Sequence, residues 1–308
     1  MIGSGVRWLL IVVLVAACSR VEKPFVEEVS ISLLPQGVHT RSGDPDDNLI
    51  SDYNILVYNS FGLLEASVYV SRREYRGEIP SLTARLLKDS PYMVFAAANL
   101  GYELKFGSSQ EALEYRFHLA YPDEFEAGIP MAAYLEDAVA GADGKIEVPL
   151  ERLMARVDLR VDRRSLDEDV SLRITSARVC NSPSSVLLFG GSTVEYWDAF
   201  FDEGYLKTGS GIYPLNHDTL DGISGTVRLY LLENLSGGIA QSYIEVKADY
   251  FSSTCHTRPG ESLIFRFHIA ESKDACRNTC YPIILKPSAT GLDCPQGWRL
   301  DKSALVYD

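Results

Sequence analysis

The chain has 308 residues, of which 46% are hydrophobic and 10% aromatic, which is enough apolar surface for one or two cores. It carries 42 acidic and 29 basic residues, a formal net charge of −13. Nucleic acids are bound through clusters of Lys and Arg that contact phosphates, so this composition excludes nucleic acid as a partner. The length favours two domains over one.

The first residues have the pattern of an export signal. Arg7 precedes an apolar run from Trp8 to Ala17, which is shorter than the roughly 20 residues that a membrane-spanning helix needs. Residues 15–18 read Val-Ala-Ala-Cys and resemble a bacterial lipobox, in which the cysteine is acylated and the chain is cut before it. We therefore expect residues 1–17 to be removed and Cys18 to carry a lipid that holds the protein at a membrane. The alternative is an ordinary signal followed by a chance cysteine.

Five further cysteines lie in the second half of the chain. They are Cys180, Cys255, Cys276, Cys280 and Cys294. An exported protein favours disulfides, and an odd number leaves at least one thiol free or paired between chains. Cys255-His256 together with the last three cysteines could gather a zinc ion, but the spacing matches no known finger or ribbon. We expect disulfides rather than zinc.

A strand and an exposed loop follow the signal. Val29, Ile31 and Leu33 alternate with serines, which predicts a strand with one apolar face. Residues 40–48 are rich in charge and in turn formers, which predicts a flexible loop that a protease can reach at Arg41.

The acidic residues of this loop suggest two interpretations. Asp44, Asp46, Asp47 and Asn48 could ligate calcium. However, Pro45 stiffens the segment and the distal Glu of a calcium loop is missing, so a solvated acidic loop is the favoured interpretation.

Short β segments continue through the first half. Residues 55–58 and 63–70 flank the turn 59–62 and predict a hairpin. The apolar run 92–98 predicts a strand buried on both faces, and 109–119 predicts one helix. Residues 146–150 predict a further strand after the turn 142–145.

The second half is also β-rich. Charged and apolar residues alternate over 152–161, which predicts a long strand with one solvent-exposed face, and a charged cluster at 162–169 ends it. Further strands are expected at 170–174, 226–232, 243–248 and 262–269. The sequence thus predicts a mostly β protein with two β-sandwich (transthyretin-like) domains in series and a minor helix in the first. The expected boundaries are 1–17 (signal), 18–41 (lipidated propeptide), 42–150 and 151–308.

Catalytic motifs do not emerge from the sequence. The five histidines show no HExxH spacing, no serine sits in a GxSxG elbow, and residues 189–192 read as a plain turn. A pair of glycosidase carboxylates is not excluded by composition but has no positive support. We expect no enzyme activity, no metal and no cofactor.

Several segments, taken in order, resemble the fimbrillin superfamily of Bacteroidales pilus proteins. After the lipobox cysteine, the first strand and Thr40-Arg41, they are Ile55–Gly62, Tyr92–Gly101, Ile129–Met131, Val148–Val157, Leu229–Asn234, Arg277–Tyr281 and Trp298–Asp301. Each motif alone is loose, and their order and spacing over nearly the whole chain carry the resemblance.

The resemblance implies a mechanism of assembly. A lipoprotein of this superfamily reaches the outer membrane, and an arginine-specific protease cuts the loop, here between Arg41 and Ser42. The strand carrying Val29, Ile31 and Leu33 then leaves, and a strand from a neighbouring subunit fills the groove, which is a form of β-augmentation. The implied partners are other fimbrial subunits, the outer membrane through the lipid, and a host or bacterial surface ligand.

Position in the fibre and two alternatives stay open. The tail 301–308 has one apolar stretch, Ala304 to Tyr307, which spans about 13 Å at ~3.3 Å per residue. We expect it to be too short to donate a strand, which suggests a tip subunit that accepts one. An anchor subunit would instead keep its first strand and donate its tail. A surface lipoprotein that binds a glycan or a protein and never polymerises would keep both Cys18 and the strand.

Overall fold

The computed structural model describes residues 25–36, 45–119, 128–161, 170–191, 200–201, 205–206, 227–236, 240–252, 262–272, 274–285 and 305–307. The strands are β1 (Val26–Pro35), β2 (Tyr53–Asn59), β3 (Leu64–Val70), β4 (Ser81–Leu87), β5 (Tyr92–Ala98), β6 (Arg116–His118), β7 (Met131–Ala138), β8 (Lys145–Arg152), β9 (Met154–Val161), β10 (Val170–Cys180), β11 (Ser182–Pro183), β12 (Ser185–Leu187), β13 (Phe200–Phe201), β14 (Tyr205–Leu206), β15 (Val227–Leu232), β16 (Tyr243–Ser252), β17 (Ser262–His268), β18 (Cys280–Leu285) and β19 (Leu305–Tyr307). One 3-10 helix, η1 (Pro45–Asn48), and one α-helix, α2 (Ser109–Glu114), complete the described part. The prediction of a mostly β protein is confirmed.

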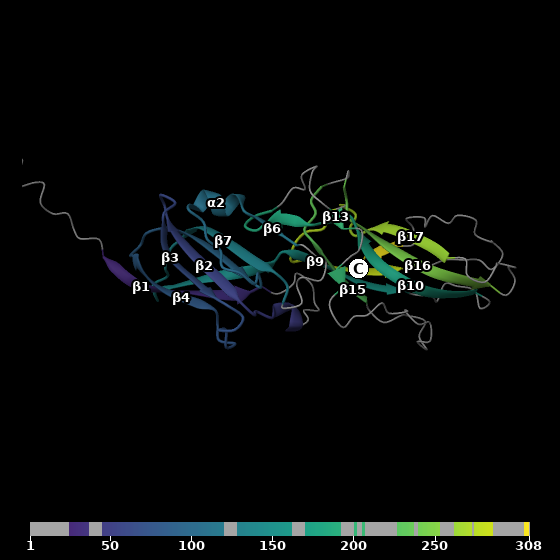
Figure 1. The fold of residues 1–308 in the computed structure, drawn as a ribbon, viewed down its shortest axis with the longest axis horizontal. Helices are drawn as coiled ribbons and strands as arrows, with labels where there is room; N and C mark the ends of the chain where they lie inside the picture. Colours follow the sequence, from purple (N-terminus) through teal and green to yellow (C-terminus); the bar gives the residue numbers. More distant parts are fainter. Residues whose placement is uncertain are drawn as a thin grey trace, which may run out of the picture.

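The first half is built on one curled sheet. Its seven strands lie in the order β3-β2-β5-β7-β8-β1-β4, and the two outer strands, β3 and β4, approach each other. The curl folds β1 and β4 over β2 and β5, so the sheet makes two layers around a core of its own. Figure 1 shows these strands gathered at one end of an elongated molecule.

The central strand β5 is buried on both faces, as its unbroken apolar run predicts. Val94 and Ala96 enter the core inside the curled sheet. Phe95 and Ala97 point the other way, into a second core that the first half shares with the second. A sheet with two covered faces needs apolar residues at every position of its central strand, and this explains why β5 does not alternate.

A turn after β5 explains the Asn-Leu-Gly motif. Asn99 adopts a left-handed conformation, with φ of 62°. Its amide donates to the carbonyls of Leu49 and Ile129, while its side-chain oxygen accepts from Ser51. Asparagine is one of the few residues that tolerates this conformation and can also bond its surroundings. One buried side chain thereby ties three separate segments together.

Two local predictions can be compared with the structure. The hairpin is confirmed, since β2 and β3 pair around a turn closed by Asn59, and Gly62 takes a φ of +76° there. The helix predicted over 109–119 is wrong in its second half, because α2 ends at Glu114. Residues 116–118 instead form β6, which pairs with β12. Tertiary strand pairing overrides a weak helical pattern at this point.

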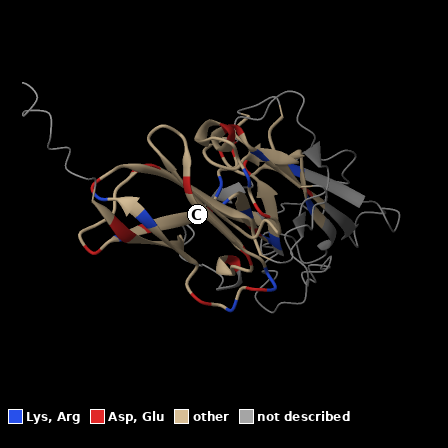
Figure 2. Ribbon diagram, turned by 60° about the vertical axis from the view of Figure 1, so that its left-hand side comes forward, with Lys and Arg blue, Asp and Glu red and all other residues tan. Residues whose placement is uncertain are grey.

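The second half is a two-layer sandwich. A five-stranded sheet (β14-β15-β9-β18-β19) faces a three-stranded sheet (β10-β16-β17), and Val157, Leu229 and Ile244 belong to the core that they share. Acidic and basic residues are interspersed over the strands and turns of both halves (Figure 2). None of the described residues forms a helix long and apolar enough to cross a membrane.

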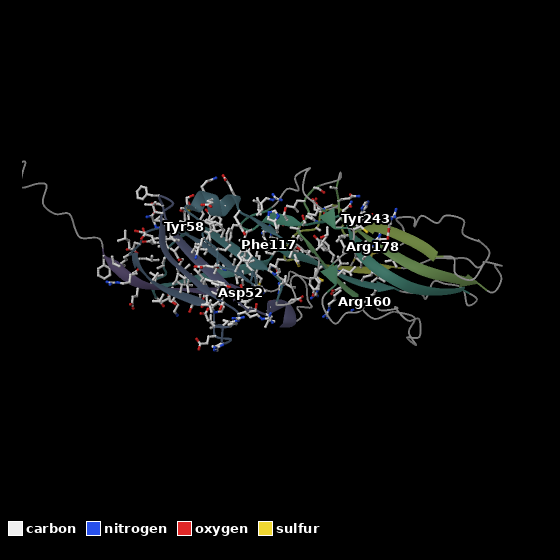
Figure 3. All side chains as sticks on the ribbon, viewed as in Figure 1. Asp52, Tyr58, Phe117, Arg160, Arg178 and Tyr243 are labelled. Atoms are coloured by element: carbon white, nitrogen blue, oxygen red, sulfur yellow. The ribbon has the colours of Figure 1, made fainter. Side chains whose placement is uncertain are left out.

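The two halves meet without a linker. β8 ends at Arg152 and β9 begins at Met154, so the chain changes sheets at Leu153, close to the predicted boundary at 150. The pairing of β6 with β12 joins the halves a second time, and Phe117 on β6 lies between them in Figure 3. The division into domains 42–150 and 151–308 stays a prediction about folding units.

Candidate functional site

The predicted first strand lies inside the curled sheet. β1 pairs in parallel with β8 and antiparallel with β4, so both of its edges are occupied. It runs from Val26 to Pro35 and is longer than the apolar alternation at 29–33, because both neighbours extend past the alternating residues. The predicted strand with one apolar face is therefore present, and it is longer than the alternating residues alone indicate.

One face of β1 completes the core of the first half. Val29, Ile31 and Leu33 are 0 to 1% exposed and pack against residues of β2, β5 and β8. Burying one such side chain contributes roughly 1.5–3 kcal/mol, so the three together contribute roughly 5–9 kcal/mol. The total stability of a domain is about 5–15 kcal/mol. Leaving the position between β8 and β4 without a strand would therefore cost a large part of the stability.

The remaining contacts of β1 come mainly from the backbone. Ser30 N–H donates to the Gly144 carbonyl, and Leu33 N–H donates to the Pro80 carbonyl. At the start of the strand, the Lys88 ammonium lies 5.8 Å from the centre of the Phe25 ring, which is 69% exposed. Backbone pairing and alternating apolar side chains are features that another strand can reproduce.

Arg152 holds both ends of the segment that carries the predicted cleavage site. Its guanidinium donates to the Gln36 carbonyl just after β1, and to the Asp47 carbonyl and the Asn48 side chain in η1. Burial lowers the pKa of Arg152, and the Asp47 carboxylate opposes this effect. The eight residues 37–44 therefore run between two stems fixed by one side chain.

The sites predicted for processing fall in parts of the chain that the structure does not describe. Arg41 and Ser42 lie within 37–44, and Cys18 lies before residue 25. The displaced strand is the part of the predicted site that the structure describes in full. Its residues Val29, Ile31 and Leu33 all face the core.

Asp47 is a buried structural residue and not part of a solvated acidic loop. It is 1% exposed, and its carboxylate accepts hydrogen bonds from Arg156 at 2.7 Å and from the Tyr230 hydroxyl at 2.8 Å. Burial and the nearby carboxylate raise the pKa of Tyr230 far above its usual range, so its hydroxyl stays protonated and donates. This use of Asp47 also leaves the calcium interpretation without its central ligand.

The charged side chains at the β8–β9 junction are buried too, so the prediction of a solvent-exposed face over 152–161 is wrong there. Arg152 and Arg156 are each 4% exposed. Burial opposes the charge of Arg156, but Asp158 and Asp47 outweigh it and raise its pKa. The same alternation of charged and apolar residues is expected for a strand whose charges face solvent and for one whose charges form buried ion pairs, so the sequence pattern does not distinguish the two.

The cysteine predictions are only partly within the described residues. Cys180, Cys276 and Cys280 are not joined to one another by disulfides, while Cys255 and Cys294 lie outside the described residues. The Cys280 thiol donates to the Asp158 carboxylate at 3.5 Å. Within the described part of the chain, no three His, Cys, Asp or Glu side chains cluster in a way that could hold a metal.

Sequence reasoning missed the polar junction beneath the strand. Arg152, Arg156, Asp47 and Tyr230 come from three distant segments, so spacing alone could not group them. A usable signal was Arg156 itself, since an arginine between Ala155 and Val157 in a buried strand needs a partner.

Comparisons with known proteins give a consistent result. No family model matches the chain, and no curated protein matches its sequence. The tip fimbrial protein Mfa3 from Porphyromonas gingivalis, solved with a C-terminal truncation, is 12% identical, with 92% of this chain and 99% of that chain covered and a TM-score of 0.57. A fimbrilin from Porphyromonas gingivalis W83 is 14% identical, with 85% and 90% covered and a TM-score of 0.55. A Parabacteroides distasonis protein assigned to cell adhesion is 14% identical, with 91% and 95% covered and a TM-score of 0.57.

These structural similarities extend over most of each chain. Because the sequence identities are low, they establish the fold and not the function. They agree with the resemblance read from the order of the sequence motifs. The chain therefore has the fold of the Bacteroidales fimbrial proteins.

Proposed function

We propose that this protein is a fimbrial subunit that is assembled when a strand from a neighbouring subunit replaces β1. The observation that carries the proposal is the seat of β1 between β8 and β4, with Val29, Ile31 and Leu33 facing the core. An N-terminal strand in this position closes the first half, and its removal opens a groove with two unpaired edges. Unpaired edges and an apolar floor are what an incoming strand needs.

Cleavage between Arg41 and Ser42 would separate the two stems held by Arg152. The downstream stem keeps the contacts of Asp47 with Arg156 and Tyr230, so it stays fixed after the cut. The upstream stem keeps one side-chain hydrogen bond, from Arg152 to the Gln36 carbonyl, besides the pairing and packing of β1. This asymmetry favours loss of β1 and retention of everything after Asp47.

Lipidation of Cys18 belongs to the same proposal. A lipid there would hold the uncut precursor at the outer membrane, and the cut after Arg41 would release the subunit from its anchor. Replacing Cys18 by Ala removes the acyl acceptor, so radiolabelled palmitate should enter the wild-type protein and not the variant. Label in the Cys18→Ala protein would contradict the lipidation.

We place the subunit at the tip of the fibre. β19 pairs antiparallel with β18 in the same chain, at the edge of the five-stranded sheet. This pairing within the chain, together with the short apolar stretch of the tail, favours a subunit that does not donate its C-terminal strand. A likeness to the tip fimbrial protein Mfa3 supports the same position. Cleaved protein should stay monomeric on its own, and homopolymers on a native gel would contradict the tip position.

Strand replacement can be tested with synthetic peptides. Protein cut by an arginine-specific protease is incubated in mild denaturant with a labelled peptide of the β1 sequence, Val26–Pro35, and retention of the label is measured by gel filtration. We expect the label to enter the protein, because the vacated groove is stabilised by any strand with the same alternation. Untreated protein, and Arg41→Ala protein treated with the same protease, should take up none, because β1 stays attached in both.

A matched pair of peptides makes the test specific for the groove. Ile31→Asp places a charge on the core face and should abolish uptake, because a buried unpaired carboxylate is costly. Ser30→Asp places the same charge on the other face, opposite Lys145 of β8, and should not weaken uptake. If β1 stays with the cut protein and no peptide exchanges, β1 is a permanent strand and the protein is an anchor or a non-polymerising lipoprotein.

A further inference from the structure

A pocket lies where the two halves of the molecule meet. It has a volume of about 390 Å³ and is lined by β7 and β8 of the first half and, from the second half, by the turn after β12 and by Glu233 and Arg277. Its lining includes Tyr134, Glu151, Phe189, Glu233 and Arg277. Ligand pockets commonly fall in this size range and at such junctions. None of the lining residues belongs to β1 or β4 themselves.

One wall of the pocket is aromatic and rigidly placed. The Tyr134 ring stacks on Phe95 with centroids 4.7 Å apart and planes 26° apart, and Phe189 meets Phe95 edge-on at 4.9 Å. Phe95 is fully buried, so it fixes both rings from behind. Tyr134 is only half-buried and presents its ring to the pocket. A flat ring of this kind packs well against an apolar C–H face.

The floor of the pocket carries an ion pair in which the arginine already donates hydrogen bonds to protein acceptors. The Arg277 guanidinium pairs with Glu233 at 3.0 Å and also donates to the carbonyls of Leu187 and Leu188. The side chains of Glu233 and Arg277 are 5% and 11% exposed. With its donors directed to protein acceptors, Arg277 is not positioned to clamp a phosphate or carboxylate in a bidentate fashion.

The side-chain group left for a ligand is an acceptor. Glu151 is half-buried, and its carboxylate makes no hydrogen bond to another described residue. The Glu233 carboxylate accepts from both the side chain and the backbone N–H of Arg277, so it is already engaged with the protein. Two carboxylates against one guanidinium leave the pocket with a negative balance, which disfavours anions. The occupant must therefore be rich in hydrogen-bond donors.

We propose that this pocket binds a neutral saccharide. A sugar ring has an apolar C–H face for Tyr134 and hydroxyl groups, one of which donates to Glu151. A protein partner inserting a Lys or Arg is the competing occupant. It is less favoured because Glu233 is already neutralised by Arg277, which leaves only Glu151 to balance a cation that must leave water.

Saturation-transfer NMR on the full-length protein tests the proposal. The probes are the methyl glycosides of glucose, galactose, mannose and N-acetylglucosamine, and we expect transfer to the ring C–H protons of at least one of them. Tyr134→Ala should abolish the transfer, while Tyr134→Phe keeps the ring and should change affinity by less than about threefold. Glu151→Gln should weaken binding about tenfold, the value of one charge-assisted hydrogen bond.

A control variant on the same strand separates the pocket from general effects of charge. Glu147→Gln, also on β8 but outside the pocket lining, changes the net charge identically and should leave binding unchanged. Failure of all four glycosides to bind the wild-type protein overturns the proposal. Binding of methylguanidinium or butylamine in their place overturns it in favour of a basic protein partner. Glycoside binding that survives both Tyr134→Ala and Glu151→Gln places the sugar elsewhere and also overturns it.

Discussion

Each half of the molecule sets a strand from a distant part of the sequence in parallel beside a central strand. β1 lies beside β8, and β18 lies beside β9. β1 is held by backbone pairing and apolar packing, whereas β18 follows a turn in which Asn278 accepts from Arg152 and Arg277 pairs with Glu233. A groove that holds a strand by apolar packing can bind any strand with the same alternation of apolar residues. Hydrogen bonds and ion pairs to particular side chains require one particular sequence. This difference in how the two strands are held is the reason to propose that β1 can be exchanged while β18 is permanent.

The largest effect is expected at Asp47, in the stem that follows β1 and the predicted cleavage loop. Asp47→Ala should lower the free energy of unfolding by about 3–5 kcal/mol, because it leaves Arg156 buried without one of its carboxylate partners. Denaturant unfolding followed by circular dichroism measures the loss. Asp143→Ala is the control, since Asp143 pairs with Lys145 on the surface and should cost about 0–1 kcal/mol. Equal losses would mean that the junction does not anchor the stem.

The next effect concerns the packing of both parallel strands. Ile31→Ala in β1 and Ile283→Ala in β18 should each cost about 2–5 kcal/mol, because both side chains are 0 to 1% exposed. Ser32→Ala, on the outward side of β1, should change stability by less than about 0.5 kcal/mol. After cleavage, added wild-type β1 peptide should restore the stability of the Ile31→Ala protein and not of the Ile283→Ala protein. Restoration of neither would show that β1 is as permanent as β18.

The sequence allowed the strands to be predicted where packing follows period and composition. Three local patterns were each compatible with one structure only. They are the apolar alternation of Val29 to Leu33, the turn at Asn59 and the unbroken apolar run of β5. The local sequence pattern predicted the wrong structure where residues far away in the sequence determine the local conformation or burial. Residues 116–118 became β6 because β12 was there to pair, and Asp47 became buried because Arg156 and Tyr230 meet it from other strands. The strand β1 was thus predictable, while the polar junction and the pocket were not.

A smaller effect is expected in the turn that fastens β18. Asn278 has a φ of 53°, and its side-chain oxygen accepts from Arg152 at 2.6 Å. Asn278→Ala should cost about 2–4 kcal/mol, since it loses a hydrogen bond to a charged group and strains the backbone. Asn278→Gly loses the same bond without the strain and should be about 1 kcal/mol less damaging. If the two variants unfold at the same denaturant concentration, the conformation of this residue does not contribute to fastening β18.

The three-stranded sheet of the second half is held across its strands by charge. Glu245 on β16 lies between Arg178 on β10 and Arg266 on β17, at 2.7 and 2.8 Å. Burial would raise the pKa of Glu245, but hydrogen bonds from Arg266 and Arg178 outweigh it and lower the pKa below its usual 4.5. The core face of β1 carries no such group, so acid should distinguish the two halves.

The smallest expected effect follows from this difference in charge. Because the folded-state pKa of Glu245 lies below the unfolded value, the unfolded chain takes up the proton first as the pH falls. The stability that Glu245 contributes is therefore complete above about pH 4.5 and is lost as the pH falls through the folded-state value. Glu245→Gln should remove this part of the acid sensitivity, about 1 kcal/mol because Arg266 is 62% exposed, so that wild type and variant converge in stability at low pH. Melting temperatures from pH 7 to pH 3 measure it, with Glu271→Gln, an exposed carboxylate of the same half, as the control that should follow wild type. A wild-type advantage over Glu245→Gln that persists unchanged at pH 3 would show that the cross-strand ion pairs do not stabilise this half.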